Sequence, residues 1–483
     1  MSEKEPEEIR REPMSRVDTA WLRMERSTNL MMITGVLMLD EPLHLDKLKR
    51  AVKQRFLAYP RFRQKVVDSA VGGAIWEDDA DFDLNWHVRL SALPGRAGKR
   101  ELERFVSQQA STPLDKTKPL WQFHLVEGYN GGSAVIIRIH HCYADGMALM
   151  QVILSLTDTS REAKKSTALS KAWLDGDGSK VAHRIGAIDR YMKLGGQVLE
   201  KGLDFYRDPG LLNVVAKEGG EIARELAVAL SLPDEPDTVL RGRLGVSKRV
   251  AWAEPLDLEE VKAVGRAFDC TVNDVLMASV AGALRSYMID RGEHVDGLTI
   301  RATVPVNLRP LEHAKKLGNH FGLVFLELPV GEDNPVRRLE RVAEGMCQLK
   351  TSRQAIVTYG LLAALGMAPP SVQRTAFDLF SRKATAVATN VPGPQMPLYL
   401  AGCPVSALMA WVPQSGSIGL GISILSYNGK VLFGLIGDAK LVPDPDAIIR
   451  RFQPEFEKLL YLALMGNWDD IIGADDAEAL MSE

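Results

Sequence analysis

The stretch AVIIRIHHCYADGMALMQVILSL, residues 134–156, places His140 and His141 at the end of an apolar run, with Asp145 and Gly146 close behind. Imidazole has an unperturbed pKa of about 6.5, so a histidine can accept a proton at neutral pH. A carboxylate four residues later can cap the next helix, or hold a basic side chain and fix the loop. A glycine permits the backbone to turn where a Cβ would collide. The pattern favours general-base catalysis.

Two other interpretations compete with catalysis. One is a pair of core histidines with satisfied hydrogen bonds, but a strand end followed by Asp-Gly is where loops carry functional sites. The other is a metal site, which needs a third ligand. The chain has no HExxH motif and no clustered Cys/His spacing. It also lacks a GxSxG elbow, a GxGxxG motif and a P-loop. A base without an enzyme nucleophile fits direct attack by a bound hydroxyl or amine, which is acyl transfer.

The elements around this stretch alternate between strand and helix patterns. We expect a buried strand over 29–39, an amphipathic helix from about residue 43, strands in AIWEDD and FDLNWHVRL, and a helix over 99–110. WQFHLVEGYNGGSAVIIRIHH predicts a hairpin that turns at 129–132. After Gly146 the pattern becomes helical. The histidine pair therefore closes the second strand of the hairpin.

The chain divides into three parts. Residues 1–157 form an N-terminal lobe that carries the histidine pair, and a polar stretch with a helical stripe then predicts a helical linker over 158–245. The stripe consists of Ile185, Ile188, Met192, Leu199 and Leu203. Residues 246–483 form a C-terminal lobe with strand candidates RVAWAEPL, LTIRATVPV, LVFLELPV, ATAVATNV, IGLGISILSY and VLFGLIGD.

The totals exclude several classes. The 483 residues are 46% hydrophobic and 25% charged, which is ordinary globular composition. A formal net charge of −3 argues against nucleic acid as a partner. Four scattered cysteines fit a reducing compartment. The charged N-terminus is unlike a signal peptide, and no apolar run reaches the length of a membrane span. We expect a cytoplasmic protein, soluble or peripheral on a membrane.

HHCYADG, residues 140–146, matches the HHxxxDG motif of acyltransferases that use coenzyme A thioesters and share the chloramphenicol-acetyltransferase-like fold. Further motifs follow in order: PLDKTKPLWQFHLVEG (113–128), TVNDVLMASVAGALR (271–285), TVPVNLRP (303–310), LGNHFG (317–322), TNVPGP (389–394) and SYNGK (426–430). Together they resemble the bacterial bifunctional wax ester synthase/diacylglycerol acyltransferase family over residues 14–460.

The resemblance implies roles for the motif residues. His141 is the general base, and His140 supports the loop. Asp145 is structural and pairs with an arginine, for which Arg309 is the candidate and Arg16 and Arg138 are alternatives.

The later motifs also receive implied roles. Asn273 lies near the oxyanion with Asp274 as its support, although both residues also suit the start of a helix. The rigid loop with Asn390, Pro392 and Gly393 either lines the substrate channel or is a turn.

Two residues depart from the family pattern. Many relatives carry small or aliphatic residues where Cys142 and Tyr143 stand in this chain. Tyr143 would narrow the channel mouth, which bears on the size of the acceptor. Cys142 invites thiol modification, although no third group is arranged to make it a nucleophile.

The fold implied by the resemblance is α/β, with two similar chloramphenicol-acetyltransferase-like lobes, mixed sheets flanked by helices, and an active-site tunnel at their interface. The reaction is transfer of a fatty acyl group from acyl-CoA to a long-chain alcohol or diacylglycerol, without a metal or redox cofactor. The greasy substrates imply peripheral attachment to the inner face of the membrane or to lipid bodies, and TYGLLAALGMAPPSVQ (358–373) is either an interfacial segment or core. The alternatives are a related CoA-dependent enzyme with another alcohol or amine acceptor, and an inactive lipid-binding protein of the same fold.

Overall fold

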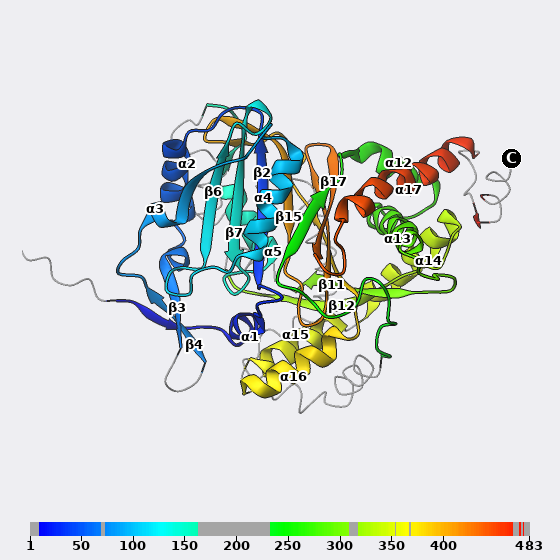
Figure 1. The fold of residues 1–483 in the computed structure, drawn as a ribbon, viewed down its shortest axis with the longest axis horizontal. Helices are drawn as coiled ribbons and strands as arrows, with labels where there is room; N and C mark the ends of the chain where they lie inside the picture. The colour runs from blue at the N-terminus through cyan, green and yellow to red at the C-terminus, as the bar shows by residue number, and fades with distance from the viewer. Residues whose placement is uncertain are drawn as a thin grey trace, which may run out of the picture.

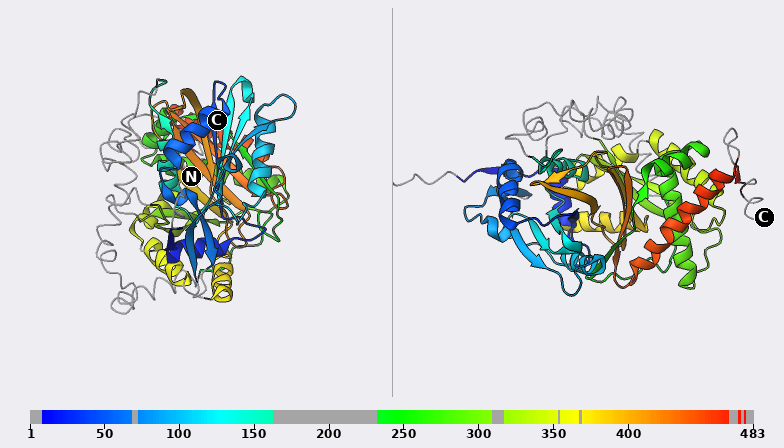
Figure 2. Two further views of the ribbon diagram at one scale, coloured as in Figure 1. Left: turned by 90° about the vertical axis from the view of Figure 1, so that its left-hand side faces the viewer. Right: turned by 90° about the horizontal axis from the view of Figure 1, so that it is seen from above.

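The computed structural model shows two α/β halves side by side, the N-terminal half in blue and cyan and the C-terminal half in green to red (Figure 1). It describes residues 9–68, 73–162, 232–308, 317–352, 354–366 and 369–466, with residues 473, 474 and 477. The helical stripe predicted over 185–203 lies outside the described residues, as does Arg309. Seen from above, the halves keep the same side-by-side order (Figure 2).

The N-terminal half is built on a seven-stranded sheet with the order β5-β6-β7-β2-β15-β14-β8. Its strands in chain order are β2 (Met32–Leu39), β5 (Val88–Ala92), β6 (Trp121–Glu127), β7 (Ser133–His140), β8 (Thr157–Asp158), β14 (Tyr399–Leu400) and β15 (Cys403–Trp411). The predicted hairpin is confirmed, because β6 and β7 pair antiparallel across a short 3-10 turn at Tyr129–Gly131. Every residue of β7 is buried, so its polar side chains are fixed by the core.

Helices and a small sheet surround this sheet. The helices are α1 (Arg16–Met24), α2 (Leu45–Ala51), which continues as a π-helical turn (Val52–Phe56), α3 (Leu84–His87), α4 (Lys99–Ser111) and α5 (Gly146–Ser155). A 3-10 turn (Pro60–Arg63) leads to the three-stranded sheet of β1 (Arg11–Pro13), β4 (Ala74–Asp78) and β3 (Gln64–Asp68). The strand predicted across FDLNWHVRL is wrong in its first half, because Asp83 caps a helical turn before β5 begins.

The C-terminal half carries a second seven-stranded sheet. The order is β10-β17-β16-β13-β11-β12, and β9 also pairs with β17. The strands are β9 (Lys248–Trp252), β10 (Leu256–Asp257), β11 (Ile300–Asn307), β12 (Phe321–Leu328), β13 (Ala386–Pro392), β16 (Leu420–Tyr427) and β17 (Lys430–Asp438). All six predicted strand segments are confirmed. The parallel pairs β11–β13 and β13–β16 make the sheet mixed.

Six helices accompany this sheet. They are α12 (Leu258–Ala267), α13 (Val272–Asp290), α14 (Pro335–Thr351), α15 (Gln354–Leu365), α16 (Pro370–Ser381) and α17 (Pro445–Met465). The long helix α13 packs among α12, α14 and α17 and is buried along most of its length. Helix α15 packs against α1 and β12, which joins the two halves at the lower edge in Figure 1.

Strands β14 and β15 cross from one half to the other. They come late in the chain, yet β15 pairs with β2, and β14 pairs with β8. The sequence analysis assigned these residues to the C-terminal lobe, 246–483. In the structure, β14 and β15 belong to the sheet of the N-terminal half. The β15 sequence, CPVSALMAW, is apolar at nearly every position, which is typical of a strand that is covered on both faces of its sheet.

The two halves are also joined by hydrogen bonds between α4 and the edge strand β9. Ser111 Oγ and Ser107 Oγ accept hydrogen bonds from the backbone N–H groups of Lys248 (2.8 Å) and Val250 (2.9 Å). Glu103 Oε1 accepts one from the N–H of Trp252 at 3.2 Å. One face of a helix thus pairs the outward N–H groups of an edge strand.

Among the described residues, no single helix has both the length and the apolar composition to cross a membrane; only the bent pair α12–α13 reaches both together.

Candidate active site

The histidine pair sits where β7 ends and the chain turns toward α5. Both side chains are buried. The His140 N–H donates to Leu120 O at 3.0 Å, and the His141 N–H donates to Met31 O at 2.7 Å. The pair is therefore fixed to the chain just before β6 and just before β2, and its backbone is held independently of any ligand.

Both ring nitrogens of His140 are engaged. Nδ1 accepts from the N–H of Cys142 at 3.1 Å, so Nε2 carries the proton and lies 3.2 Å from Glu25 Oε2. Burial opposes ionisation of Glu25, but His140 and Lys116 outweigh it and lower the pKa of this carboxyl to about 2. A ring occupied on both sides cannot accept a proton from a substrate, which supports the supporting role predicted for His140.

His141 is placed differently. Its ring stacks on Trp21, with centroids 4.3 Å apart, and Phe321 lies tilted at 5.6 Å. Nδ1 is sealed from solvent, and the residue lines a cavity. Burial lowers the pKa of His141 to about 4, although Asp145 and the residue's own carbonyl favour the charged ring. The imidazole is therefore neutral at pH 7 and able to accept a proton.

Asp145 shapes the loop around the pair. Its Oδ1 accepts from the N–H of Ala148 at 2.9 Å, so it caps α5, and its Oδ2 accepts from the N–H of His320 at 3.1 Å. The Asp145 N–H donates to Gly318 O at 3.3 Å. This carboxylate is thus committed to structure. Its predicted pairing with Arg309 stays a prediction.

Arg138, one of the alternative partners of Asp145, is held elsewhere. It donates to the side chains of Gln109 (3.2 Å) and Gln122 (3.0 Å), and to Thr112 O.

The expected reason for Gly146 is wrong. A Cβ at this position would meet no atom within 4 Å, and the backbone is not in the left-handed region. The residue instead lines two cavities at once. Its missing side chain keeps a passage open rather than relieving a collision.

Asn273 and Asp274 lie in the first turn of α13. Thr271 is the N-cap, and Asp274 completes a capping box by accepting from the Thr271 N–H at 2.7 Å. The helix start was expected at Asn273 or Asp274, but the N-cap, Thr271, lies two or three residues earlier. Asn273 Oδ1 accepts from Asn390 Nδ2. Asn390 lines the His141 cavity, whereas Asn273 stands behind it.

The cavity before His141 lies between the two halves. Its empty space, which includes a part open to solvent, is about 670 Å³. The N-terminal half contributes Trp21, His141 and residues 145–147. The C-terminal half contributes Pro305, Asn307, Phe321, Leu323, Val387, Thr389, Asn390, Val391, Val412 and Pro413. The site is thus at the interface, as predicted.

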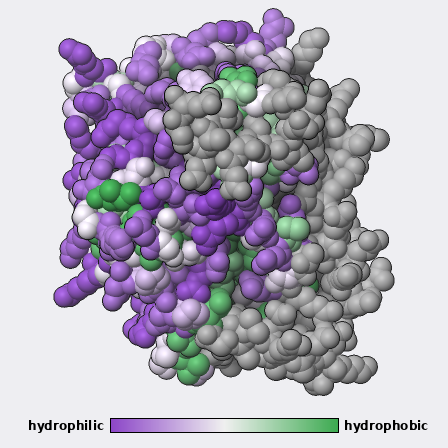
Figure 3. Space-filling model, turned by 90° about the vertical axis from the view of Figure 1, so that its right-hand side faces the viewer, coloured by the Kyte–Doolittle hydropathy of each residue, from purple (hydrophilic) through white to green (hydrophobic). Residues whose placement is uncertain are grey.

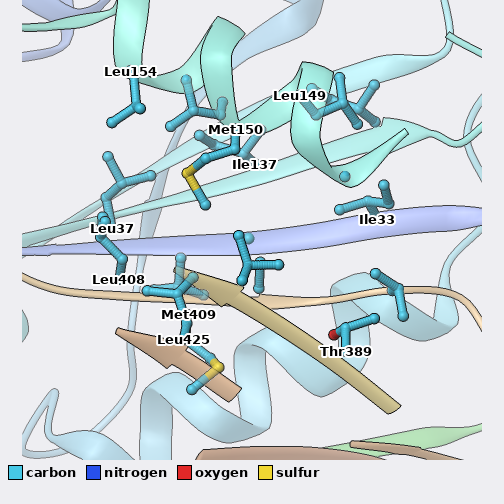
Figure 4. Close-up of a pocket in the computed structure, with 18 of the residues that line it drawn as sticks. Ile33, Leu37, Ile137, Leu149, Met150, Leu154, Thr389, Leu408, Met409 and Leu425 are labelled. Atoms are coloured by element: carbon cyan, nitrogen blue, oxygen red, sulfur yellow. The ribbon is translucent and has the colours of Figure 1, made fainter. Parts of the chain in front are cut away.

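A second, almost wholly apolar cavity adjoins the first, with about 860 Å³ of empty space that includes a part open to solvent. Gly146, Thr389, Val391 and Val412 line both cavities. Figure 4 shows side chains from α5, β2 and the strands near Leu408 and Leu425 converging on it, among them Met150, Leu154 and Ile33. The shape and lining suit a hydrocarbon chain.

Comparison with known families identifies the family to which the chain belongs. The model described as wax ester synthase/diacylglycerol acyltransferase catalytic domain matches residues 14–276, and the WS/DGAT C-terminal domain matches residues 317–460. The chain belongs to the wax ester synthase/diacylglycerol acyltransferase family. It is 29% identical over 474 residues to a putative diacylglycerol O-acyltransferase of Mycobacterium tuberculosis H37Rv, covering 94% of this chain and 92% of the relative.

Solved structures share the fold of this family member. The wax ester synthase/diacylglycerol acyltransferase from Marinobacter aquaeolei VT8 superposes with a TM-score of 0.66 at 23% identity, over 94% of this chain and all of that chain. A starter condensation domain of rhizomide synthetase in complex with C8-CoA and Leu-SNAC superposes with a TM-score of 0.56 at 13% identity, over 96% of each chain. The predicted two-lobed α/β fold is confirmed.

Sequence reasoning missed two polar residues of this candidate site. Asn319, in the LGNHFG motif, donates through Nδ2 to His141 O at 2.8 Å and to Asp18 Oδ1 at 2.8 Å. Both side chains are buried. The motif itself was the signal for Asn319, because a buried-looking asparagine beside a glycine needs partners. Asp18 has no comparable signal, since it reads as an ordinary first-turn carboxylate.

Three other residues of the motifs serve the fold. Tyr143 does not narrow the channel, because its ring points into the N-terminal core and its OH donates to Gln64 O at 2.7 Å. Cys142 is fully buried, and burial raises the pKa of its thiol well above the usual value, so the expected thiol modification is wrong. The Gly393 N–H donates to Ser426 O at 2.8 Å, which continues the β13–β16 pairing past its last pair, Pro392 with Ser426.

Proposed function

We propose that this protein transfers a fatty acyl group from acyl-CoA to the hydroxyl of a long-chain alcohol or diacylglycerol. One observation carries the proposal: a neutral, buried imidazole faces a cavity that continues into an apolar chamber. The names of relatives, diacylglycerol O-acyltransferase and wax ester synthase, support the two acceptor classes. The rhizomide domain, whose title includes C8-CoA, supports acyl-CoA as a ligand of this fold.

The chemistry needs one base. The acceptor hydroxyl lies against His141 Nε2, which takes its proton as the oxygen attacks the thioester carbonyl carbon. The C–O bond forms, the C–S bond breaks, and the proton passes from His141 to the departing thiolate of coenzyme A. This scheme requires neither a metal nor a redox cofactor.

The developing oxyanion needs a donor in the cavity. The Asn390 amide has two hydrogens, one of which goes to Asn273 Oδ1. The other is free to donate to the substrate. We therefore assign the oxyanion contact to Asn390 and give Asn273 the task of orienting it, with Asp274 fixing the helix start behind both.

The fatty acyl chain occupies the apolar cavity beyond Gly146. Nearly all of its lining is aliphatic side chain, so an acyl chain that enters it is transferred from water to a hydrocarbon environment, which is favourable. The acceptor then reaches His141 from the remaining part of the first cavity.

Peripheral contact with a lipid surface supplies the greasy substrates. The C-terminal side of the molecule is mainly hydrophilic, with small separate hydrophobic groups (Figure 3). On α16, Val372 and Leu379 are exposed, whereas Ala355, Leu362 and Leu365 of α15 are buried. We therefore propose that the exposed side chains of α16, rather than the buried ones of α15, rest on the lipid surface.

The test is release of coenzyme A from palmitoyl-CoA by purified protein with hexadecanol, with dioleoylglycerol, or with no acceptor. His141→Gln should lower the acceptor-dependent rate by roughly 10²- to 10⁴-fold. The control is His124→Gln, which removes another buried histidine whose pKa burial lowers to about 4, but which lies outside the cavity. Equal rates in His141→Gln and wild type, or release that needs no acceptor, would refute the proposal.

A further inference from the structure

Helix α1 presents three side chains to the histidine pair. Asp18, Trp21 and Glu25 are spaced by three and four residues, so they share one face of the helix and its C-terminal cap. Trp21 contacts the His141 ring and Glu25 contacts the His140 ring, whereas Asp18 reaches the pair through Asn319. The sequence motifs and the proposed chemistry leave all three without a role.

Two of the contacts hold the backbone and the first ring. Glu25 pairs with His140 Nε2 at 3.2 Å, and His140 in turn accepts the N–H of Cys142. Asp18 accepts from both the N–H (3.1 Å) and the side-chain amide (2.8 Å) of Asn319, which is bonded to His141 O. Both contacts meet at the peptide group between His141 and Cys142, whose C=O and N–H are thereby tied to α1 through Asn319 and His140.

The third contact covers the base itself. The Trp21 ring is stacked on the His141 imidazole at 21° and is 5% exposed. Phe321 lies beside both rings, with its centroid 5.4 Å from that of Trp21 and 5.6 Å from that of His141. Indole is the largest flat apolar surface that the chain can offer, and it excludes water from one whole face of the imidazole.

We propose that α1 is the positioning element of the general base, in which Trp21 fixes the plane of the His141 ring and keeps it dry. The expected effect on catalysis rests on the proposed function, whereas the expected effect on the position and hydration of the His141 ring does not. Trp21 is a positioning residue and does not need to touch the reacting atoms.

The groups that face the imidazole define what its titration reports. Asp145, the N-cap of α5, favours the charged ring, and His140 of the same loop opposes it. From α1 comes the Asp18 carboxylate, behind Asn319. Phe321 on β12 and Asn390 on β13 do not titrate. Trp21 carries no net charge, so we expect its removal to act on the pKa of His141 mainly by hydrating the ring, which moves that pKa toward its ordinary value.

The experiment compares Trp21→Leu, Trp21→Phe and the matched control Trp252→Leu in the full-length protein. Trp252 is similarly buried, 3% exposed, and stands beside Trp411 outside the cavity. Two quantities are measured: kcat for acyl transfer, and the titration of His141 by NMR with ¹³C-labelled histidine, assigned with His141→Gln. The second does not depend on activity.

We expect Trp21→Leu to lower kcat by roughly a hundredfold, the effect of a misplaced catalytic group. His141 should then titrate above about 4 and closer to 6.5. Trp21→Phe should restore both values, and Trp252→Leu should change neither. An unchanged titration in Trp21→Leu, or an equal change in Trp252→Leu, overturns the inference. A wild-type protein without acyl transfer would sink the proposed function, while the titration would still decide the role of Trp21.

Discussion

Gly146 offers a direct way to close the passage between the two cavities. It lines both, and no atom lies within 4 Å of the place where a Cβ would stand. Gly146→Leu would therefore be accommodated by the fold and would occupy the space through which we expect the acyl chain to pass. Gly146→Ala adds a single carbon at the same point and is the matched control.

The magnitude follows from the volume of the side chain. A leucine displaces about four methylene groups of a bound chain, and at about 0.8 kcal/mol for each buried CH₂ the lost binding free energy is about 3 kcal/mol. This corresponds to roughly a 200-fold loss in kcat/KM for a long-chain acyl-CoA. A butyryl chain is too short to fill the apolar cavity, so we expect it to lose far less.

The assay measures kcat/KM for palmitoyl-CoA and butyryl-CoA with one alcohol, and then varies the alcohol at constant acyl chain. We expect the palmitoyl-to-butyryl ratio to collapse in Gly146→Leu and to persist in Gly146→Ala. A fold defect would lower both substrates equally and leave the ratio unchanged. If the loss follows the length of the alcohol instead, the apolar cavity holds the acceptor and our assignment of the acyl chain is refuted.

Three further predictions concern charge and hydrogen bonding. Asn390→Ala should lower kcat by roughly 10²- to 10³-fold with little change in KM, and Asn273→Ala by less, because it only orients Asn390; equal losses would argue against this order. Because His141 must be neutral and its pKa is about 4, kcat should hold down to about pH 5 and fall below about pH 4; an acidic limb near pH 6.5 would contradict the burial argument. Burial raises the pKa of Glu103 to about 7, so its ionised form destabilises the fold above that pH, and this penalty disappears as the pH falls from 7 toward 4.5. Glu103→Gln, which still accepts from the Trp252 N–H, should raise the melting temperature at pH 8 and match wild type at pH 5.

The sequence predicts most strands and the place of the catalytic loop, because these depend on local pattern. Alternating or continuous apolar runs identify β2, β6, β7 and the strands of the second sheet. His141 and Asp145 come from one short motif, so their proximity needs no tertiary information. The position of the cavity at the interface was predicted in another way, from the resemblance to the family.

What the sequence does not predict depends on contacts between distant segments. The pairing of β15 with β2 joins residues more than 360 positions apart, and no local pattern specifies it. Asp18 and Asn319 are likewise about 300 residues apart and meet only in the fold. The expectations for Gly146 and Tyr143 are wrong because composition does not tell which side of a backbone faces a cavity.

The late arrival of β15 has a consequence for synthesis on the ribosome. Until it emerges, β2 is an unpaired edge of sequence MITGVLML, which is apolar and carries no charge. The end of β8 at Asp158 and the start of β15 at Cys403 are 245 positions apart, which corresponds to roughly 12 to 50 s of translation at about 5–20 residues per second. During this interval the nascent N-terminal half presents an aggregation-prone strand. Its yield in cells should therefore depend on chaperones that bind extended apolar segments, and cutting the gene between the two halves should give an insoluble N-terminal fragment.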